Sequence, residues 1–403
     1  MPPALLATSA AMNDVRDNLV SGWRSIPHSY AVVGEYLCLE LLRRTPRLRL
    51  FFQDIPYFNP SWQASAGLHS AESDAALRSI PPPPAGLSAD AELRVEYPYD
   101  LLRPARAART TVFGTAEYLS VPPSFFAGGV SASEAQKRSG FAVLTPSNWS
   151  KQGFIRSGMA PENVTVLTLG FDPAVFQPVT QERRARIRAE IGFSPDDFVF
   201  YHAGSMSLNK GLRFLLPAFA SLAQTHPHAR LLLKGLDSLY SSKQVFEAQL
   251  GSLAPDVARA VTSRLRYVGE RLSYADMARL YQASDCYVSS YVGEGFNMPV
   301  LEAAACGLPV ICTAGGPTDD FVTEDFALQI ASTLEPVAVS SVPQAMGLIP
   351  DQEHLAHLML CAIDDAEFRE LARTAGPKYM GERYTWAKVV DRLLPIILPG
   401  SAS

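Results

Sequence analysis

The chain has 403 residues, and because a domain usually holds about 100 to 200 residues, this length predicts two to four domains, most simply two of similar size. Hydrophobic residues make up 47% and charged residues 19% of the chain, a composition that argues against whole-chain disorder and against a fibrous repeat. The 35 Lys and Arg residues against 40 Asp and Glu residues leave a net charge of -5, which weighs against nucleic acid as a partner.

The cysteines and the first residues indicate the compartment. The 5 cysteines form no CxxC pair and have no histidine at metal-ligand spacing, so we interpret them as small core residues of a protein in a reducing environment. The segment MPPALLATSAAM lacks the basic start of a signal peptide, and no stretch approaches the roughly 20 apolar residues of a membrane-spanning helix. These features predict a cytoplasmic protein.

In the N-terminal half, short β-rich segments alternate with helical ones, the pattern of a parallel sheet with helices on both faces. Residues 28–44 contain few polar side chains and predict a well-buried helix. The proline run 81–84 cannot be helical and predicts an exposed connection. The predicted strands cover residues 18–23, 48–54, 92–99, 110–118 and 141–147.

A second series of the same kind follows a join near residues 167–184, where prolines bracket a segment that becomes charged and helical. Residues 214–226 predict a helix of this series. Its predicted strands cover residues 197–204, 229–235, 265–269, 286–291 and 309–315. The sequence therefore predicts two doubly wound α/β halves.

The segment 289–316 is the most informative. A strand ends in a loop that contains Gly295 and Asn297, Pro299 can occupy the first turn of a short helix, and Gly307 ends that helix. Such an arrangement presents free backbone N–H groups and the positive end of a helix dipole, as phosphate sites do.

Two carboxylates accompany this expected phosphate site. Glu294 lies in the loop, and Glu302 lies about one turn inside the helix. Because like charges repel, these carboxylates suit neutral hydroxyl groups, such as those of a ribose and a sugar, better than the phosphate itself. A solvated pair is the alternative, and the surrounding Gly, Asn, Pro and apolar strand favour a functional pair.

The stretch EGFNMPVLEAAACGLPVI resembles the Glu-x7-Glu signature of glycosyltransferase family 4 (group 1), whose members have the GT-B fold of two facing Rossmann-like domains with a cleft between them. The resemblance is strong over about residues 140–395. It implies an acceptor-binding domain over 1–173, a nucleotide-sugar-binding domain over 174–384, and a last helix, 385–398, that rejoins the first domain. The other matching segments are 147–178, 202–211, 267–291 and 384–394.

The resemblance also assigns roles to residues. Lys210 would neutralise the diphosphate, Glu302 would hold the ribose hydroxyls, and Glu294 would hold the transferred sugar. Lys210, Glu294 and His28 are the candidate catalytic residues. The candidate donor-binding residues are Ser205, Lys210, Leu272, Glu294, Gly295, Phe296, Asn297, Met298 and Glu302.

The sequence departs from the family pattern in the phosphate loop and on the acceptor side. Ser205 stands where the family often has an arginine. Either Lys210 and the helix start suffice for the phosphate charge, or another arginine such as Arg213 or Arg271 supplies the missing charge. No glycine follows the first predicted strand after Gly22, which leaves His28 as a cleft-facing group or a structural cap.

The family's frequent histidine after the fourth strand is also absent. Thr115 and Glu117 at this place are, together with His28, the candidates for acceptor contacts. Asp319 and Asp320 match a place of ligand contact, and helix capping explains them equally well.

These features predict a retaining glycosyltransferase that moves a sugar from a nucleoside diphosphate to a hydroxyl of a glycan, a lipid-linked or a small-molecule acceptor, in bacterial polysaccharide assembly. No cofactor is expected, and without a DxD motif no metal is required. A sugar-nucleotide epimerase or hydrolase and a non-catalytic nucleotide-sugar scaffold remain alternatives. The basic stretches 41–50 and 101–110 predict either a peripheral membrane contact or solvated arginines. The sequence leaves the oligomeric state open.

Overall fold

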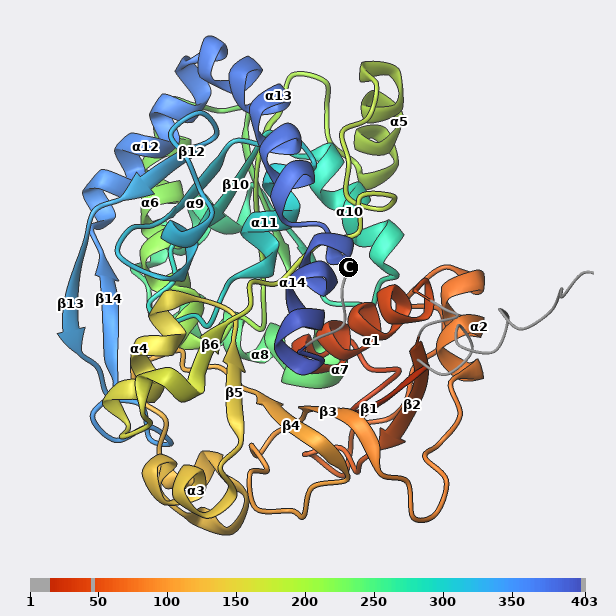
Figure 1. The fold of residues 1–403 in the computed structure, drawn as a ribbon. Coiled ribbons are helices and arrows are strands. Elements are labelled where there is room, and N and C mark those ends of the chain that lie inside the picture. Colours follow the sequence, from red (N-terminus) through yellow and green to blue (C-terminus); the bar gives the residue numbers. More distant parts are fainter. Residues whose placement is uncertain (1–14, 45–47, 400–403) are drawn as a thin grey trace, which may run out of the picture. The chain divides into compact units, whose positions relative to one another are not determined.

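The structure is a computed structural model, and it describes residues 15–44 and 48–399. The first twelve residues, which carried the prediction on a signal peptide, and Arg47 of the first basic stretch lie outside the described residues. Within the described part the chain divides into two compact units, which Figure 1 shows as a ribbon. Of the described residues, unit 1 comprises 15–44, 48–114, 123–144 and 389–399, and unit 2 comprises 115–122 and 145–388.

Unit 1 is built on a parallel sheet in which strands β2, β1, β3, β4 and β5 pair in this order. The crossover from β1 to β2 carries α1, whose N-terminal cap is His28, and α2 follows β2. The strands and helices are β1 (Arg16–Gly22), α1 (Ser29–Leu42), β2 (Leu48–Asp54), α2 (Ala71–Ser79), β3 (Ala89–Val95), β4 (Ala107–Phe113), α3 (Ala132–Ser139), β5 (Ala142–Thr145) and most of α14 (Trp386–Ile397). The predicted strands and the buried helix of this half are confirmed, although β1, β3 and β4 begin two or three residues earlier than predicted and β3, β4 and β5 end earlier.

One predicted strand, 110–118, runs too far. The strand β4 ends at Phe113, and Gly114 makes a last ladder bond to Leu144. The backbone N–H of Ala116 instead donates to the hydroxyl of Ser150 at 2.5 Å. Residues after Gly114 therefore leave the sheet because a side chain of α4 (Asn148–Arg156) takes over their backbone hydrogen bond.

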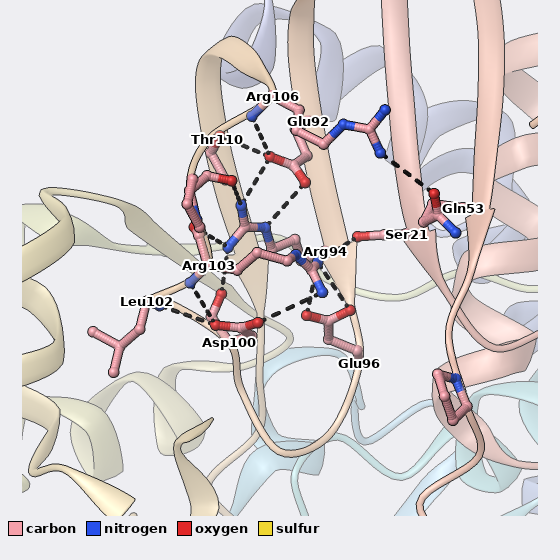
Figure 2. Close-up of polar contacts among 12 residues, drawn as sticks. Ser21, Gln53, Glu92, Arg94, Glu96, Asp100, Leu102, Arg103, Arg106 and Thr110 are labelled. Atoms are coloured by element: carbon pink, nitrogen blue, oxygen red, sulfur yellow. Dashed lines mark hydrogen bonds and ion pairs between the residues drawn. The ribbon is translucent and has the colours of Figure 1, made fainter. Parts of the chain in front are cut away.

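A charged network covers one face of the unit 1 sheet, and Figure 2 shows it. Glu92 and Arg94 alternate on β3, are almost fully buried, and form a two-pronged ion pair with N–O distances of 3.1 and 3.0 Å. The Arg94 guanidinium also donates to three backbone carbonyls of the loop between β3 and β4. This network holds the loop against the sheet, and it satisfies charges that would be costly to bury alone.

The same loop contains the second basic stretch, and its arginines have protein partners. Arg103 pairs with Glu96 at 3.0 Å, and Arg106 donates to Gln53 at 3.3 Å (Figure 2). Burial raises the pKa of Glu96 to about 7, although Arg103 opposes this shift. In the first stretch, Arg49 pairs with Asp17 at 2.7 Å. These ion pairs lower the charge that the stretches offer to anionic lipid, and the membrane contact stays a prediction.

Unit 2 contains a parallel sheet with the order β12-β11-β10-β7-β8-β9, and a separate antiparallel hairpin β13–β14. Helices cover both faces of the sheet, as predicted. Cys286 and Val288 of β10 face the core beneath α6 (Leu212–Thr225) and α12 (Gln352–Asp364). Tyr287 packs on Tyr201 and on Tyr281 of α10 (Tyr274–Ala283) on the other face. The strands are β6 (Val164–Val166), β7 (Phe198–Ala203), β8 (Ala229–Lys234), β9 (Leu265–Val268), β10 (Cys286–Ser289), β11 (Val310–Thr313), β12 (Ala327–Ile330), β13 (Ser332–Pro336) and β14 (Met346–Pro350).

The helices of unit 2 begin and end where the sequence places capping residues. Thr180 caps α5 and Gly192 ends it in the left-handed region, while Ser273 caps α10. The helices are α4 (Asn148–Arg156), α5 (Gln181–Ile191), α6 (Leu212–Thr225), α7 (Asp237–Tyr240), α8 (Ser242–Gly251), α9 (Pro255–Thr262), α10 (Tyr274–Ala283), α11 (Met298–Ala305), α12 (Gln352–Asp364) and α13 (Ala366–Arg383). The cysteines are free, and four of the five are buried, as predicted.

Candidate functional site

The loop between β7 and α6 directs the Lys210 side chain. Gly211 has a φ of 72°, and a Cβ there would lie 1.7 Å from the carbonyl oxygen of Ser290, so only glycine fits. The hydroxyl of Ser290 donates to the carbonyl of Gly211 at 3.0 Å. The aliphatic stem of Lys210 passes over Gly204, where a Cβ would lie 3.2 Å from its Cδ. Gly204, Gly211 and Ser290 thus fix the direction of the Lys210 side chain.

The rest of this loop is braced against the loop after β10. The backbone N–H of Val292 donates to the carbonyl of Asn209 at 2.7 Å, and the Asn209 amide donates to the carbonyl of Gly293 at 3.1 Å. The hydroxyl groups of Ser205 and Ser207 bond each other at 2.6 Å. Ser205 is therefore part of the internal bonding of the loop, and its contact with a donor stays a prediction.

Lys210 and Glu294 form an ion pair between the ammonium Nζ and carboxylate Oε1. Their side chains are 20% and 8% exposed, so the pair is largely shielded from water. Burial alone would lower the pKa of Lys210, but the negative charges of Glu294 and Glu117 outweigh it and raise this pKa above its usual value. The structure thus brings together the two residues that the sequence named as catalytic in this half.

Glu117 joins this pair from a distant part of the sequence. Its segment lies against the glycine loop: a Cβ at Gly293 would lie 2.6 Å from the Tyr118 ring, and one at Gly295 would lie 2.9 Å from Thr115. Glu117 reaches solvent, yet the protein that surrounds it lowers its hydration and raises its pKa to about 7. The negative charge of Glu294 adds to this shift, and Lys210 opposes it. Glu117 therefore lies at the charged site, and its contact with an acceptor stays a prediction.

The start of α11 offers unpaired backbone donors. Asn297 adopts the left-handed conformation with φ 80° and turns its amide inward to donate to the Ser289 hydroxyl at 2.9 Å. Phe296 is buried against Phe321. Among residues 15–44 and 48–399, the backbone N–H groups from Gly295 to Met298 have no acceptor. As predicted, the loop presents these groups at the positive end of a helix dipole, and Gly307 with φ 83° ends the helix.

Glu302 has a partner that sequence reasoning missed. The hydroxyl of Tyr281 on α10 donates to Glu302 Oε2 at 2.8 Å. Burial raises the pKa of Glu302 to about 7, and the Tyr281 hydrogen bond opposes this shift. Tyr281 is fully buried and packs on Tyr201, so its position on an apolar helix face concealed its polar role.

Arg213, on the first turn of α6, is exposed. Burial is the main cause of the raised pKa of Tyr118; Glu117 and Glu294 add to it, and Arg213 opposes it. Arg213 is therefore electrostatically near the charged site, which keeps it a candidate for the phosphate charge that Ser205 lacks. Leu272 is half-buried in the loop between β9 and α10, and its contact with a base stays a prediction.

Other candidates hold structural positions. In unit 1 the ring Nδ1 of His28 accepts the backbone N–H of Tyr30 at 3.2 Å, and burial lowers the pKa of His28 to about 4. Asp319 accepts the backbone N–H of Gly315 at 2.8 Å, and Asp320 accepts that of Asn148 at 2.7 Å, at the start of α4. The bonds of His28 and Asp320 are capping bonds at the starts of α1 and α4, whereas Asp319 also accepts the side-chain amide of Gln329 at 2.7 Å and holds the loop before residues 317–320. Ligand contact by any of the three stays a prediction.

Within residues 15–44 and 48–399, no group of three or more His, Cys, Asp and Glu side chains is arranged to hold a metal ion. None of the described helices combines the length and the apolar character that crossing a membrane needs.

Residues 197–338 match the family Glycosyl transferases group 1. The chain is 26% identical over 238 residues to the GDP-mannose-dependent monoacylated alpha-(1-6)-phosphatidylinositol monomannoside mannosyltransferase of Corynebacterium glutamicum, covering 57% of this chain and 55% of that protein. It is 27% identical over 246 residues to the D-inositol 3-phosphate glycosyltransferase of Segniliparus rotundus, covering 58% and 46%. The chain spans about half the length of these two curated relatives.

The fold is similar to a solved structure over nearly the whole chain. The crystal structure of HepE from Anabaena in complex with UDP and glucose superimposes with a TM-score of 0.68 and 16% identity, covering 95% of this chain and 100% of that chain. With a doubly wound parallel sheet in each unit, the fold is GT-B, as predicted.

Proposed function

Because residues 197–338 belong to the family Glycosyl transferases group 1, we propose that the protein is a retaining glycosyltransferase that moves a sugar from a nucleoside diphosphate to an acceptor hydroxyl. The observation that carries the proposal is the ion pair of Lys210 and Glu294 beside the free N–H groups at the start of α11. A cation and unpaired amides suit a diphosphate, and the adjacent carboxylate suits sugar hydroxyls.

Donor binding rearranges this pair in our proposal. In the structure, Glu294 neutralises Lys210. A bound diphosphate competes for the ammonium group, because phosphate oxygens form strong charge-assisted hydrogen bonds with lysine. Glu294 is then available to accept hydrogen bonds from the transferred sugar, while Glu302 accepts the ribose hydroxyls through the oxygen that Tyr281 leaves open.

The chemical step needs charge stabilisation more than a protein nucleophile. As the glycosidic bond breaks, negative charge grows on the leaving diphosphate, where Lys210 and the α11 amides stabilise it. A phosphate oxygen takes the proton of the acceptor hydroxyl on the same face, so the product keeps the configuration of the donor. Because a lysine and a helix start supply the stabilisation, we propose that the reaction needs no metal.

The relatives suggest a setting for this activity. One relative is named as GDP-mannose-dependent and acts on a phosphatidylinositol mannoside, and HepE was solved with UDP and glucose. We propose a GDP- or UDP-sugar as the donor, and a bacterial glycan or glycolipid as the setting. For a silent scaffold, a lysine whose stem lies against Gly204 and whose ammonium group is held on a carboxylate would have no evident use.

The proposal is tested by thermal unfolding in the presence of UDP-, GDP-, ADP- and dTDP-sugars. A ligand at a hundred times its Kd stabilises a protein by about 2.7 kcal/mol, which raises the Tm of a domain of this size by roughly 5 to 10 °C. We expect one base class to produce this shift, and the free sugar and the nucleoside to produce none. If no nucleotide sugar raises the Tm, the proposed function is wrong; binding without nucleotide release in a broad acceptor panel would favour the scaffold.

A further inference from the structure

A polar cavity lies at the amino ends of the strands of the unit 2 sheet, at the edge opposite the proposed donor site. It has a volume of about 50 Å³ and is lined by residues that directly precede two strands, Asp285 before β10 and Pro309 before β11. Gly307, just past the end of α11, also lines it. Lys210, Glu294 and the start of α11 follow the carboxyl ends of the strands, so the cavity is separated from the proposed donor site by the length of the sheet.

Three arginines line this cavity: Arg184 on α5, and Arg369 and Arg373 on α13. Arg184 donates through Nη2 to Asp285 at 2.6 Å and to the carbonyl of Ser284 at 2.9 Å. Arg369 donates through Nη1 to backbone carbonyls at the end of α12, and Arg373 donates through Nε to Glu370 at 3.2 Å. A guanidinium has five N–H donors. Among the described residues, each of the three therefore keeps N–H donors that have no acceptor.

The positive charge around the cavity exceeds the negative charge. Arg188 adds a fourth guanidinium, which shares Asp285 with Arg184 at 2.9 Å. Against four arginines stand Asp285 and the mostly exposed Glu370, which leaves an excess of two positive charges. Burial lowers the pKa of Arg184, and the charges of Arg188 and Arg373 lower it further, although Asp285 opposes them. An anion in the cavity would relieve this repulsion.

The size of the cavity suits a small ion. One water molecule needs about 10 to 15 Å³ of such volume, so about 50 Å³ holds roughly three to five oxygen atoms. A tetrahedral oxyanion has four oxygens, and planar guanidinium groups bind such oxygens in pairs. A whole nucleotide does not fit, which separates this cavity from the donor site in ligand as well as in place.

We propose that the cavity between α5, α13 and the end of α11 binds a small oxyanion of the phosphate class, either as free phosphate or as the phosphoryl group of a monoester. Arg373 is the residue to change, because Arg184 also holds Asp285 and Arg369 also holds the end of α12. The side chain of Arg373 is 38% exposed and makes one ion pair, so its replacement leaves the core intact.

The test is the Tm of four proteins, the wild type and the variants Arg373→Gln, Arg259→Gln and Lys210→Ala, titrated with sodium phosphate and with sodium chloride at equal ionic strength. Arg259 is an exposed arginine of the same unit, and its replacement changes the net charge equally. Lys210→Ala removes the cation of the proposed donor site. We expect phosphate to raise the Tm of the wild type, Arg259→Gln and Lys210→Ala, and the apparent Kd to rise roughly ten- to a hundredfold in Arg373→Gln.

The proposal is overturned if phosphate raises the wild-type Tm no more than chloride does, or if Arg373→Gln responds like the wild type. Loss of the response in Lys210→Ala alone would place the phosphate at the donor site and would equally overturn it. A parallel titration with glycerol phosphate distinguishes the sources, since tighter binding than inorganic phosphate identifies a monoester and weaker binding identifies the free ion. The outcome is independent of the proposed transferase activity, because the readout is binding.

Discussion

Replacement of Lys210 by alanine is expected to lower kcat by roughly a hundred- to a thousandfold, the usual cost of losing one group that stabilises charge in a transition state. The donor KM should change less, because the charge on the diphosphate grows as the glycosidic bond breaks. With Ser205 bonded to Ser207 in place of a second phosphate-binding cation, little else in the loop can compensate. Steady-state kinetics with the identified donor measure both parameters.

Two further variants serve as controls for Lys210→Ala. Lys243→Ala removes an exposed lysine of the same unit and should keep wild-type kinetics. Lys210→Arg keeps the charge and should retain part of kcat, which would separate charge from the mere integrity of the loop. An unchanged kcat in Lys210→Ala would move the role to another cation, and Arg213 would be the first to examine.

Replacement of Glu302 by glutamine is expected to weaken donor binding roughly ten- to a hundredfold at about pH 8, the value of a charged hydrogen bond. In the folded protein, burial raises the pKa of Glu302 to about 7, so the carboxylate that accepts ribose hydroxyls forms only above this pH. Wild-type donor affinity should therefore fall as the pH drops through 7, and it should fall more steeply than the affinity of Glu302→Gln, in which Glu117 still titrates near this pH. Calorimetric titration at several pH values checks both expectations.

The same raised pKa has a consequence for the free protein. A carboxyl group whose folded pKa lies above its unfolded value stabilises the fold at low pH, and this contribution is lost as the pH rises to about 7. Glu117 also titrates near this pH. The free energy of unfolding is therefore compared between wild type and Glu302→Gln, because the difference isolates the contribution of Glu302. Glu367→Gln, at an exposed position of α13, is the matched control.

Equal donor affinity of Glu302→Gln and wild type at about pH 8 would contradict the ribose assignment.

The local part of the site could be predicted from the sequence. The order of strand, glycine-containing loop, Pro299 and Gly307 is contiguous, and the structure places Pro299 in the first turn of α11 and Gly307 just after the helix, as expected. The ion pair of Lys210 and Glu294 was also within reach, because both residues follow carboxyl ends of neighbouring parallel strands, β7 and β10. The alternation of β-rich and helical segments predicted the two sheets. A parallel strand that is buried on both faces of its sheet forms a short apolar run that is easy to recognise in the sequence.

Contacts between distant segments that do not follow neighbouring strands could not be predicted. Glu117 reaches the charged site because the chain leaves β4 early and bonds to Ser150, and no local pattern marks that departure. Tyr281 looks like one more aromatic on an apolar helix face, and only the fold sets its hydroxyl on Glu302. The cavity arginines come from α5 and α13, which are about 180 residues apart, so their common cavity appears only in three dimensions.

The configuration of the anomeric carbon in the product tests the central claim most directly. One sample contains the protein, an α-linked donor of the base class found by thermal unfolding, an acceptor and excess EDTA, and proton NMR follows the anomeric signal of the first product. If a donor phosphate oxygen accepts the acceptor proton on the face that the leaving group vacates, while Lys210 and the α11 amides stabilise the diphosphate, the product signal is that of the α anomer and the rate equals that without EDTA. A β-linked product would contradict the proposed mechanism, and an α-linked product formed only without EDTA would contradict the role given to Lys210.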